Sequence, residues 1–117
     1  MRAELKSLHS PDIENLSSWI PERQDFAILL QVIAGPAGEI GGESFDLTLC
    51  SPSWINKTVE KERIITGRHL LIVARYDYGR ISEFISNYVS SCYGETWQEI
   101  ALKLARFGHW EFEDYRA

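Results

Sequence analysis

A chain of 117 residues is the length of one domain, and it can bury roughly two-thirds of its unfolded surface, so it needs neither a metal nor a disulfide to fold. The formal net charge is -5 and the chain contains no basic run, which argues against a nucleic-acid binder, because phosphate recognition needs a basic surface. No apolar run approaches membrane-spanning length and no signal core follows Met1, so we expect a cytoplasmic protein with no membrane partner.

Two strands and a long connection are predicted in the first third of the chain. Residues 2–8 alternate between polar and apolar side chains, as a half-buried strand does. Residues 25–34 are apolar on both faces, which is typical of a central strand covered on both sides. The polar residues 9–24 between them form a loop, in which Trp19 and Ile20 are expected to tuck down and anchor it.

A glycine-rich turn, residues 35–43, leads into a third strand. Residues 44–50 alternate, with inward apolar positions at Phe45, Leu47 and Leu49. The second and third strands are therefore expected to form a long hairpin with an exposed turn. The turn contains Glu39 and no lysine, so it would repel phosphate instead of binding it.

A short helix and a fourth strand follow the hairpin. Ser51-Pro52 predicts a helix start, with Ser51 as the N-cap and proline at the first helical position. One or two helical turns are expected over residues 53–58. The apolar run within residues 69–76 predicts the next strand.

Two helices are predicted in the last third of the chain, and Asp77 is the expected N-cap of the first. Apolar side chains recur there at helical spacing: Ile81, Phe84, Ile85, Tyr88, Val89 and Cys92. Thr96 and Glu99 have the spacing of a capping box, which would start a second helix over residues 97–107. Gly108 is placed to end that helix as a left-handed cap.

The order of these elements, strands first and helices last, predicts the fold class. We expect a single α+β domain over residues 1–117, with an antiparallel sheet of about four to five strands and the two C-terminal helices packed on one face.

The closing segment GHWEFEDY, residues 108–115, mixes aromatic rings with carboxylates. If the chain runs extended after Gly108, Glu111 and Glu113 lie on one face, separated by roughly 7 Å, which is compatible with an acid/base pair in a small hydrolase. Alternatively, the rings dock on the fold and the carboxylates face water. We favour docking of Trp110, Phe112 and Tyr115, because nothing else in the sequence marks a substrate cleft.

Metal, cofactor and nucleophile sites are not predicted. His9, His69 and His109 lie far apart in the sequence and share no metal-ligand spacing with Cys50 or Cys92. The two cysteines are expected to be reduced and packed as small apolar groups. With no catalytic residue, metal or cofactor indicated, a binding protein is favoured over an enzyme.

Several segments together resemble the immunity protein 8 family of bacterial polymorphic toxin systems. The most specific are GRHLLIVARYD (67–77), GETWQEIA (94–101) and GHWEFEDYR (108–116), and the likeness covers nearly the full length. The resemblance implies a cytoplasmic protein that is not an enzyme and that binds and blocks a cognate toxin domain. Such toxins are delivered between bacteria by contact-dependent or secretion-linked routes.

The resemblance also implies a protein partner, the cognate toxin C-terminal domain. Many toxins of these systems are nucleases, whose substrate grooves are cationic, and carboxylates can occupy such a groove in place of phosphate. The toxin-binding candidates are the carboxylates on the hairpin and the closing segment: Glu39, Glu43, Asp46, Glu111, Glu113 and Asp114. We expect a monomeric inhibitor; a hydrolase that uses Glu111 and Glu113, or a homo-oligomeric scaffold, are the alternatives.

Overall fold

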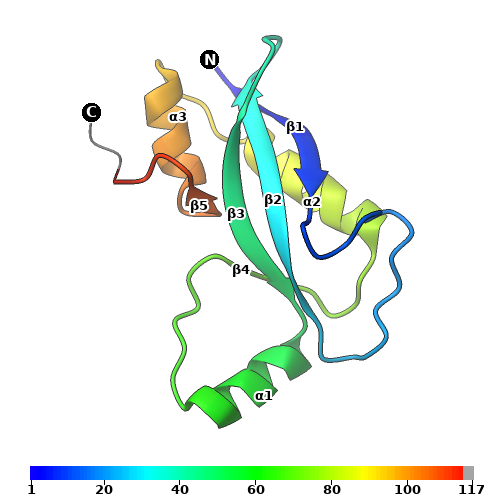
Figure 1. The fold of residues 1–117 in the computed structure, drawn as a ribbon. Helices are drawn as coiled ribbons and strands as arrows, with labels where there is room; N and C mark the ends of the chain where they lie inside the picture. The colour runs from blue at the N-terminus through cyan, green and yellow to red at the C-terminus, as the bar shows by residue number, and fades with distance from the viewer. Residues whose placement is uncertain (115–117) are drawn as a thin grey trace.

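The fold is built on one five-stranded β-sheet. The computed structural model describes residues 1–114 of the 117 and shows this sheet with three helices around it (Figure 1). The strands are β1 (Ala3–His9), β2 (Ala27–Pro36), β3 (Glu43–Cys50), β4 (Leu70–Ile72) and β5 (His109–Trp110). The first four lie in the order β1-β2-β3-β4, and β5 also pairs with β3. The predicted α+β class is confirmed.

The sheet is mixed, so the prediction of an antiparallel sheet is wrong for one strand. β1, β2 and β3 are antiparallel neighbours and β5 is antiparallel to β3, but β4 runs parallel to β3. The reason is the connection: the chain leaves β3, passes through a helix and returns to the sheet edge in the same direction, as parallel strands require.

Helices α2 (Tyr78–Ser90) and α3 (Trp97–Leu104) pack on one face of the sheet, as predicted (Figure 1). The core between them is built from fully buried side chains of both layers: Leu30, Val32, Phe45, Leu47, Leu49, Ile85, Val89, Ile100 and Leu104. The other face of β2 is partly open, because Leu29 is 36% exposed. The expectation that this strand is covered on both sides is therefore wrong, since α2 and α3 occupy the same side.

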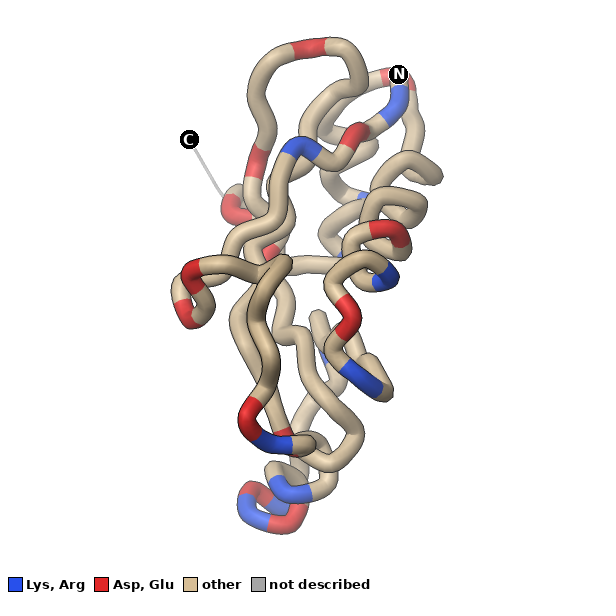
Figure 2. Tube along the Cα trace, turned by 90° about the vertical axis from the view of Figure 1, so that its right-hand side faces the viewer, with Lys and Arg blue, Asp and Glu red and all other residues tan. Residues whose placement is uncertain are grey.

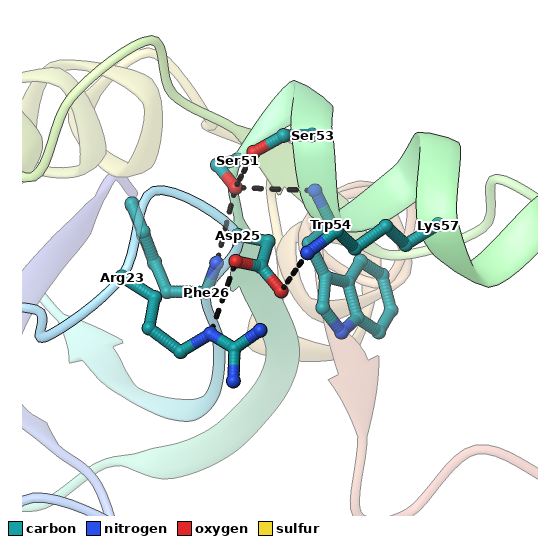
Figure 3. Close-up of polar contacts among 7 residues, drawn as sticks. All are labelled: Arg23, Asp25, Phe26, Ser51, Ser53, Trp54 and Lys57. Atoms are coloured by element: carbon teal, nitrogen blue, oxygen red, sulfur yellow. Dashed lines mark hydrogen bonds and ion pairs between the residues drawn. The ribbon is translucent and has the colours of Figure 1, made fainter.

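Helix α1 (Pro52–Glu62) is longer than the one or two turns expected. Ser51 caps it as predicted, because its hydroxyl oxygen accepts a hydrogen bond from the Trp54 N–H at 3.3 Å. The same oxygen accepts the Phe26 N–H at 3.1 Å (Figure 3). Ser51 is 2% exposed, so one buried hydroxyl joins the start of α1 to the residue that precedes β2.

An ion pair adds a second link between α1 and the start of β2. Lys57 lies 3.0 Å from a carboxylate oxygen of Asp25, and Arg23 lies 3.3 Å from the other (Figure 3). The hydrogen bond from Lys57 holds the pKa of Asp25 below its usual value. The side chains involved are mostly exposed, so this link contributes less than the buried Ser51.

Leu16 and Trp19 help to fasten the long connection between β1 and β2 to the rest of the fold. Leu16 is buried, and its carbonyl accepts a hydrogen bond from the Tyr76 hydroxyl at 2.5 Å. Trp19 packs edge-on against Tyr76, with ring centroids 4.7 Å apart. The prediction is confirmed for Trp19 and wrong for Ile20, which is 82% exposed.

The caps of α2 and α3 follow the predicted chemistry with one difference. The Asp77 carboxylate accepts the Arg80 N–H at 3.2 Å and caps α2. At α3, the Thr96 hydroxyl accepts the Glu99 N–H at 3.2 Å. The Glu99 carboxylate accepts the Glu95 N–H at 2.9 Å instead of the Thr96 N–H, so the expected reciprocal pair is only half formed.

Gly108 does not have the predicted left-handed conformation. In residues 1–114, the glycines with positive φ are Gly38 and Gly41, both in the hairpin turn. α3 ends at Leu104, and Gly108 instead lies against the backbone of Phe45, where an added Cβ would be 2.8 Å from the carbonyl carbon. A glycine is needed there for close approach and not for backbone handedness.

Candidate functional site

The closing segment is held against the start of β3. Trp110 pairs with Phe45 and His109 with Asp46, and the Trp110 ring stacks on Phe45 with centroids 6.4 Å apart. Trp110 is 8% exposed, so it docks as predicted. Phe112 contacts Trp110 edge-on but is 41% exposed, and the expectation for Tyr115 lies outside the described residues.

Glu43 bridges the two tryptophans of this region. Its carboxylate accepts the indole N–H of Trp97, from α3, and the indole N–H of Trp110, from β5, the latter at 2.9 Å. The two bonds use both carboxylate oxygens. Glu43 therefore fastens a helix and an edge strand to the start of β3, which is a structural role that its sequence position did not indicate.

Ser44 donates hydrogen bonds to two more of the carboxylates that were predicted to contact the toxin. Its backbone N–H donates to the Glu111 side chain at 2.9 Å, and its hydroxyl donates to Asp46 at 2.5 Å. The Glu111 N–H in turn donates to the Ser44 carbonyl at 3.2 Å. Ser44 thus holds in place both Asp46, in β3, and Glu111, which directly follows β5.

Glu113 has a cationic partner from a different part of the chain. One of its carboxylate oxygens lies 2.7 Å from Arg68, and the other lies 3.4 Å from His109. The Glu113 N–H donates to the Trp110 carbonyl at 2.9 Å, so the chain turns after β5. The expectation of an extended segment with Glu111 and Glu113 side by side is wrong beyond Trp110, because this turn redirects the chain.

These contacts define an acidic edge on the β3–β5 side of the sheet: Glu43, Asp46, Glu111, Glu113 and Asp114. Asp114 is exposed, has φ of 64° and forms no hydrogen bond or ion pair with residues 1–114. Among residues 1–114, it is therefore the carboxylate of the acidic edge that a partner can bind without breaking a described internal bond.

Glu39 lies apart from the acidic edge, at the tip of the β2–β3 hairpin. The tip protrudes at one end of the molecule, and Glu39 is the only charged residue in positions 37–42 (Figure 2). Its carbonyl accepts a hydrogen bond from Lys6, but its carboxylate has no partner within the described part of the chain. Ile40 beside it is fully exposed, so the tip offers one carboxylate and one apolar side chain to solvent.

The geometry does not support acid/base or thiol chemistry at these positions. The carboxylates of Glu111 and Glu113 are occupied by separate donors, Ser44 and Arg68, instead of facing one reacting atom. Burial raises the pKa of the Cys50 and Cys92 thiols, which keeps both protonated. In residues 1–114, no group of three His, Cys, Asp or Glu side chains is arranged to hold a metal ion.

A groove of about 590 Å³ lies between β4 and α2. It is on the side of β3 to which β5 also pairs. We call it the β4 groove; it is lined by Leu71, Ile72, Val73, Ala74, Arg75, Asp77, Arg80, Ile81 and Phe84. Ile72 and Phe84 are each 54% exposed, which is high for large apolar side chains.

The sequence pattern did not reveal the groove, because it placed Ile72 within a strand and Phe84 on the apolar stripe of a helix. It predicted a strand over residues 69–76, but β4 is only Leu70–Ile72, so the apolar run leaves the sheet early. It placed Phe84 on the buried stripe of its helix, but the buried residues of α2 are Ile81, Ile85 and Val89. Periodicity identifies an apolar face without showing how far the layer beneath it extends.

Comparisons with known proteins agree with the sequence resemblance. The model of a family described as Immunity protein 8 matches residues 3–115. No curated protein and no solved structure matches the chain. None of the helices in residues 1–114 is long and apolar enough to cross a membrane.

Proposed function

The chain belongs to the immunity protein 8 family, and we propose that it neutralises a cognate bacterial toxin domain by binding it and covering its active site or substrate groove. The family match over residues 3–115 is the observation that carries this proposal, since an immunity protein implies a protein toxin as its partner. The protein would act as a monomer in the cytoplasm of a bacterium that uses polymorphic, contact-dependent toxins.

The charge distribution supports a toxin with a cationic surface, such as a nuclease. The chain has a formal net charge of -5; the acidic edge lies along β3 and β5, and Glu39 lies at the hairpin tip. Because internal hydrogen bonds hold Glu111 and Asp46 in place, this negative surface is ordered before the partner arrives. Complementary charge would speed association and disfavour wrong partners.

The hydrolase alternative is not favoured. Its two proposed catalytic residues, Glu111 and Glu113, each hold a separate part of the fold together. A general acid and a general base need to face a common substrate atom, and the carboxylate interactions seen here direct them to Ser44 and Arg68 instead.

Complex formation tests the proposal. The C-terminal domain of the toxin encoded next to this gene is purified, mixed with the protein, and examined by calorimetry and light scattering. We expect a one-to-one complex with a dissociation constant of about 10 nM or below, which is ordinary for an interface of about 1,600 Å². A mixture whose two proteins elute separately at micromolar concentration contradicts the proposal.

Charge removal at the available carboxylates is expected to slow association. In the variant Glu39→Lys/Asp114→Asn, the association rate constant should fall about tenfold at low salt, and the difference should shrink as salt rises. Stopped-flow mixing with the toxin domain measures both quantities. Asn is chosen at position 114 because it tolerates the positive φ there.

The matched control changes the net charge equally at the other end of the molecule. Glu60 and Glu62 are exposed on α1, which lies opposite the hairpin tip (Figure 1). The variant Glu60→Lys/Glu62→Gln should associate within about twofold of the wild-type rate constant. Equal slowing by the two variants would show that only total charge matters and that these carboxylates do not face the toxin.

A further inference from the structure

Within residues 1–114, β4 pairs only with β3, so its other backbone edge is free of any described strand. The Thr48 N–H donates to the His69 carbonyl at 2.9 Å, and the Val73 N–H donates to the Cys50 carbonyl at 2.9 Å. Because successive residues of a strand point their backbone groups to opposite sides, the N–H and C=O of Leu70 and Ile72 are directed away from β3. An edge of this kind is a template for one more strand.

The side chains next to this edge favour an apolar segment. Ile72 and Phe84 stand 54% exposed in the β4 groove, and the volume of about 590 Å³ is large enough for side chains of a docked peptide. Exposed apolar side chains around a concave surface mark an interaction site more strongly than isolated ones.

The charges of the groove are opposite to those of the whole protein. Arg75 and Arg80 line it together with a single acid, Asp77. Asp77 is already occupied, because it caps α2 and lies 3.6 Å from Arg80. No ion pair within residues 1–114 involves Arg75, so the groove offers a guanidinium to an incoming carboxylate.

The groove and the acidic edge follow one another along the same side of β3. β5 pairs with Phe45 and Asp46, and β4 pairs with the stretch from Thr48 to Cys50. A single partner can therefore contact both, with a basic surface against the acidic edge and a different segment in the groove.

We propose that the toxin domain docks through an extended segment that adds to the free edge of β4, places an apolar side chain in the β4 groove and sets a carboxylate against Arg75 and Arg80. This inference rests on the proposed function and names the part of the toxin that is recognised. The added strand supplies backbone hydrogen bonds, and the groove supplies selectivity for the side chains.

Three matched substitutions test the groove in complexes with the purified toxin domain. Ile72→Asp and Phe84→Asp place a carboxylate in the groove, and Leu102→Asp makes the same change at an α3 position that is 56% exposed. We expect the dissociation constant to rise at least about 30-fold for the first two variants and to stay within about threefold of wild type for the third. Circular dichroism of each variant verifies the fold.

Amide hydrogen exchange on the wild-type complex tests the strand addition without any substitution. The N–H groups of Leu70 and Ile72 should exchange at least about tenfold more slowly when the toxin domain is bound. If wild-type protein binds the toxin but the groove variants bind equally well, or these two amides keep their exchange rates, the docking mode is wrong and the proposed function stands. If wild-type protein does not bind the toxin at all, the proposed function fails, and the docking mode fails with it.

Discussion

Replacing Gly108 by alanine is expected to lower the free energy of unfolding by about 3 kcal/mol. The new Cβ would lie 2.8 Å from the carbonyl carbon of Phe45 and 2.9 Å from its oxygen. Phe45 is fully buried in β3, so its backbone has no room to retreat. The clash would push β5 off the sheet edge and expose Trp110. Urea unfolding followed by tryptophan fluorescence measures the loss.

Gly67 provides the matched control for this substitution. No heavy atom lies within 4 Å of a Cβ built on Gly67, and its φ is not in the left-handed region. Gly67→Ala should therefore change the free energy of unfolding by less than about 1 kcal/mol, and the sign can be stabilising. If Gly108→Ala unfolds at the same urea concentration as wild type, the close contact between Gly108 and Phe45 is not a feature of the folded protein.

Removing the carboxylate of Glu43 is expected to destabilise the protein to a similar degree. Glu43→Ala leaves the indole N–H groups of Trp97 and Trp110 without their acceptor, and Trp110 is 8% exposed, so water reaches it poorly. Two hydrogen bonds to a charged group are lost at once. We expect the free energy of unfolding to fall by about 3 kcal/mol, measured in urea.

Two further variants separate the hydrogen bonds from the charge. Glu43→Gln keeps one carbonyl oxygen and should lose about half as much stability as Glu43→Ala. Glu39→Ala, at the exposed hairpin tip, removes the same charge and should cost less than about 0.5 kcal/mol. Equal stability of the Glu39 and Glu43 alanine variants would mean that the two indole contacts contribute nothing measurable.

Local sequence patterns were sufficient to predict the helix N-caps and the buried face of β3. Ser51, Asp77 and Thr96 were identified as N-caps because each bonds to an amide only three residues away. The alternation of Phe45, Leu47 and Leu49 gave the buried face of β3, because the period of two is a property of the strand itself.

Contacts between distant residues were beyond the reach of such patterns. Gly108 was interpreted as a helix cap from its position after an apolar helix, whereas its role depends on Phe45, far away in the sequence. Glu43 was interpreted as a surface acid, whereas Trp97 and Trp110 make it an internal acceptor. The end of β4 at Ile72 depends on where β3 ends at Cys50, which no local pattern shows.

The predicted toxin contacts divide according to their internal bonds. Four of the six candidate carboxylates, those of Glu43, Asp46, Glu111 and Glu113, already accept a hydrogen bond or ion pair from within the fold. Glu39 and Asp114 remain available, and the proposal that they contact the toxin follows from that difference. The sequence identifies the acidic residues, but the fold is needed to show which of their carboxylates already form internal hydrogen bonds or ion pairs.

Titration of the toxin's own activity with this protein tests the central claim of occlusion most directly. The toxin domain is assayed on its substrate while purified immunity protein is added in increasing amounts. The account predicts a linear fall to background at a one-to-one ratio, with no loss when a denatured sample is added. Full toxin activity in the presence of a severalfold excess of folded protein would contradict it.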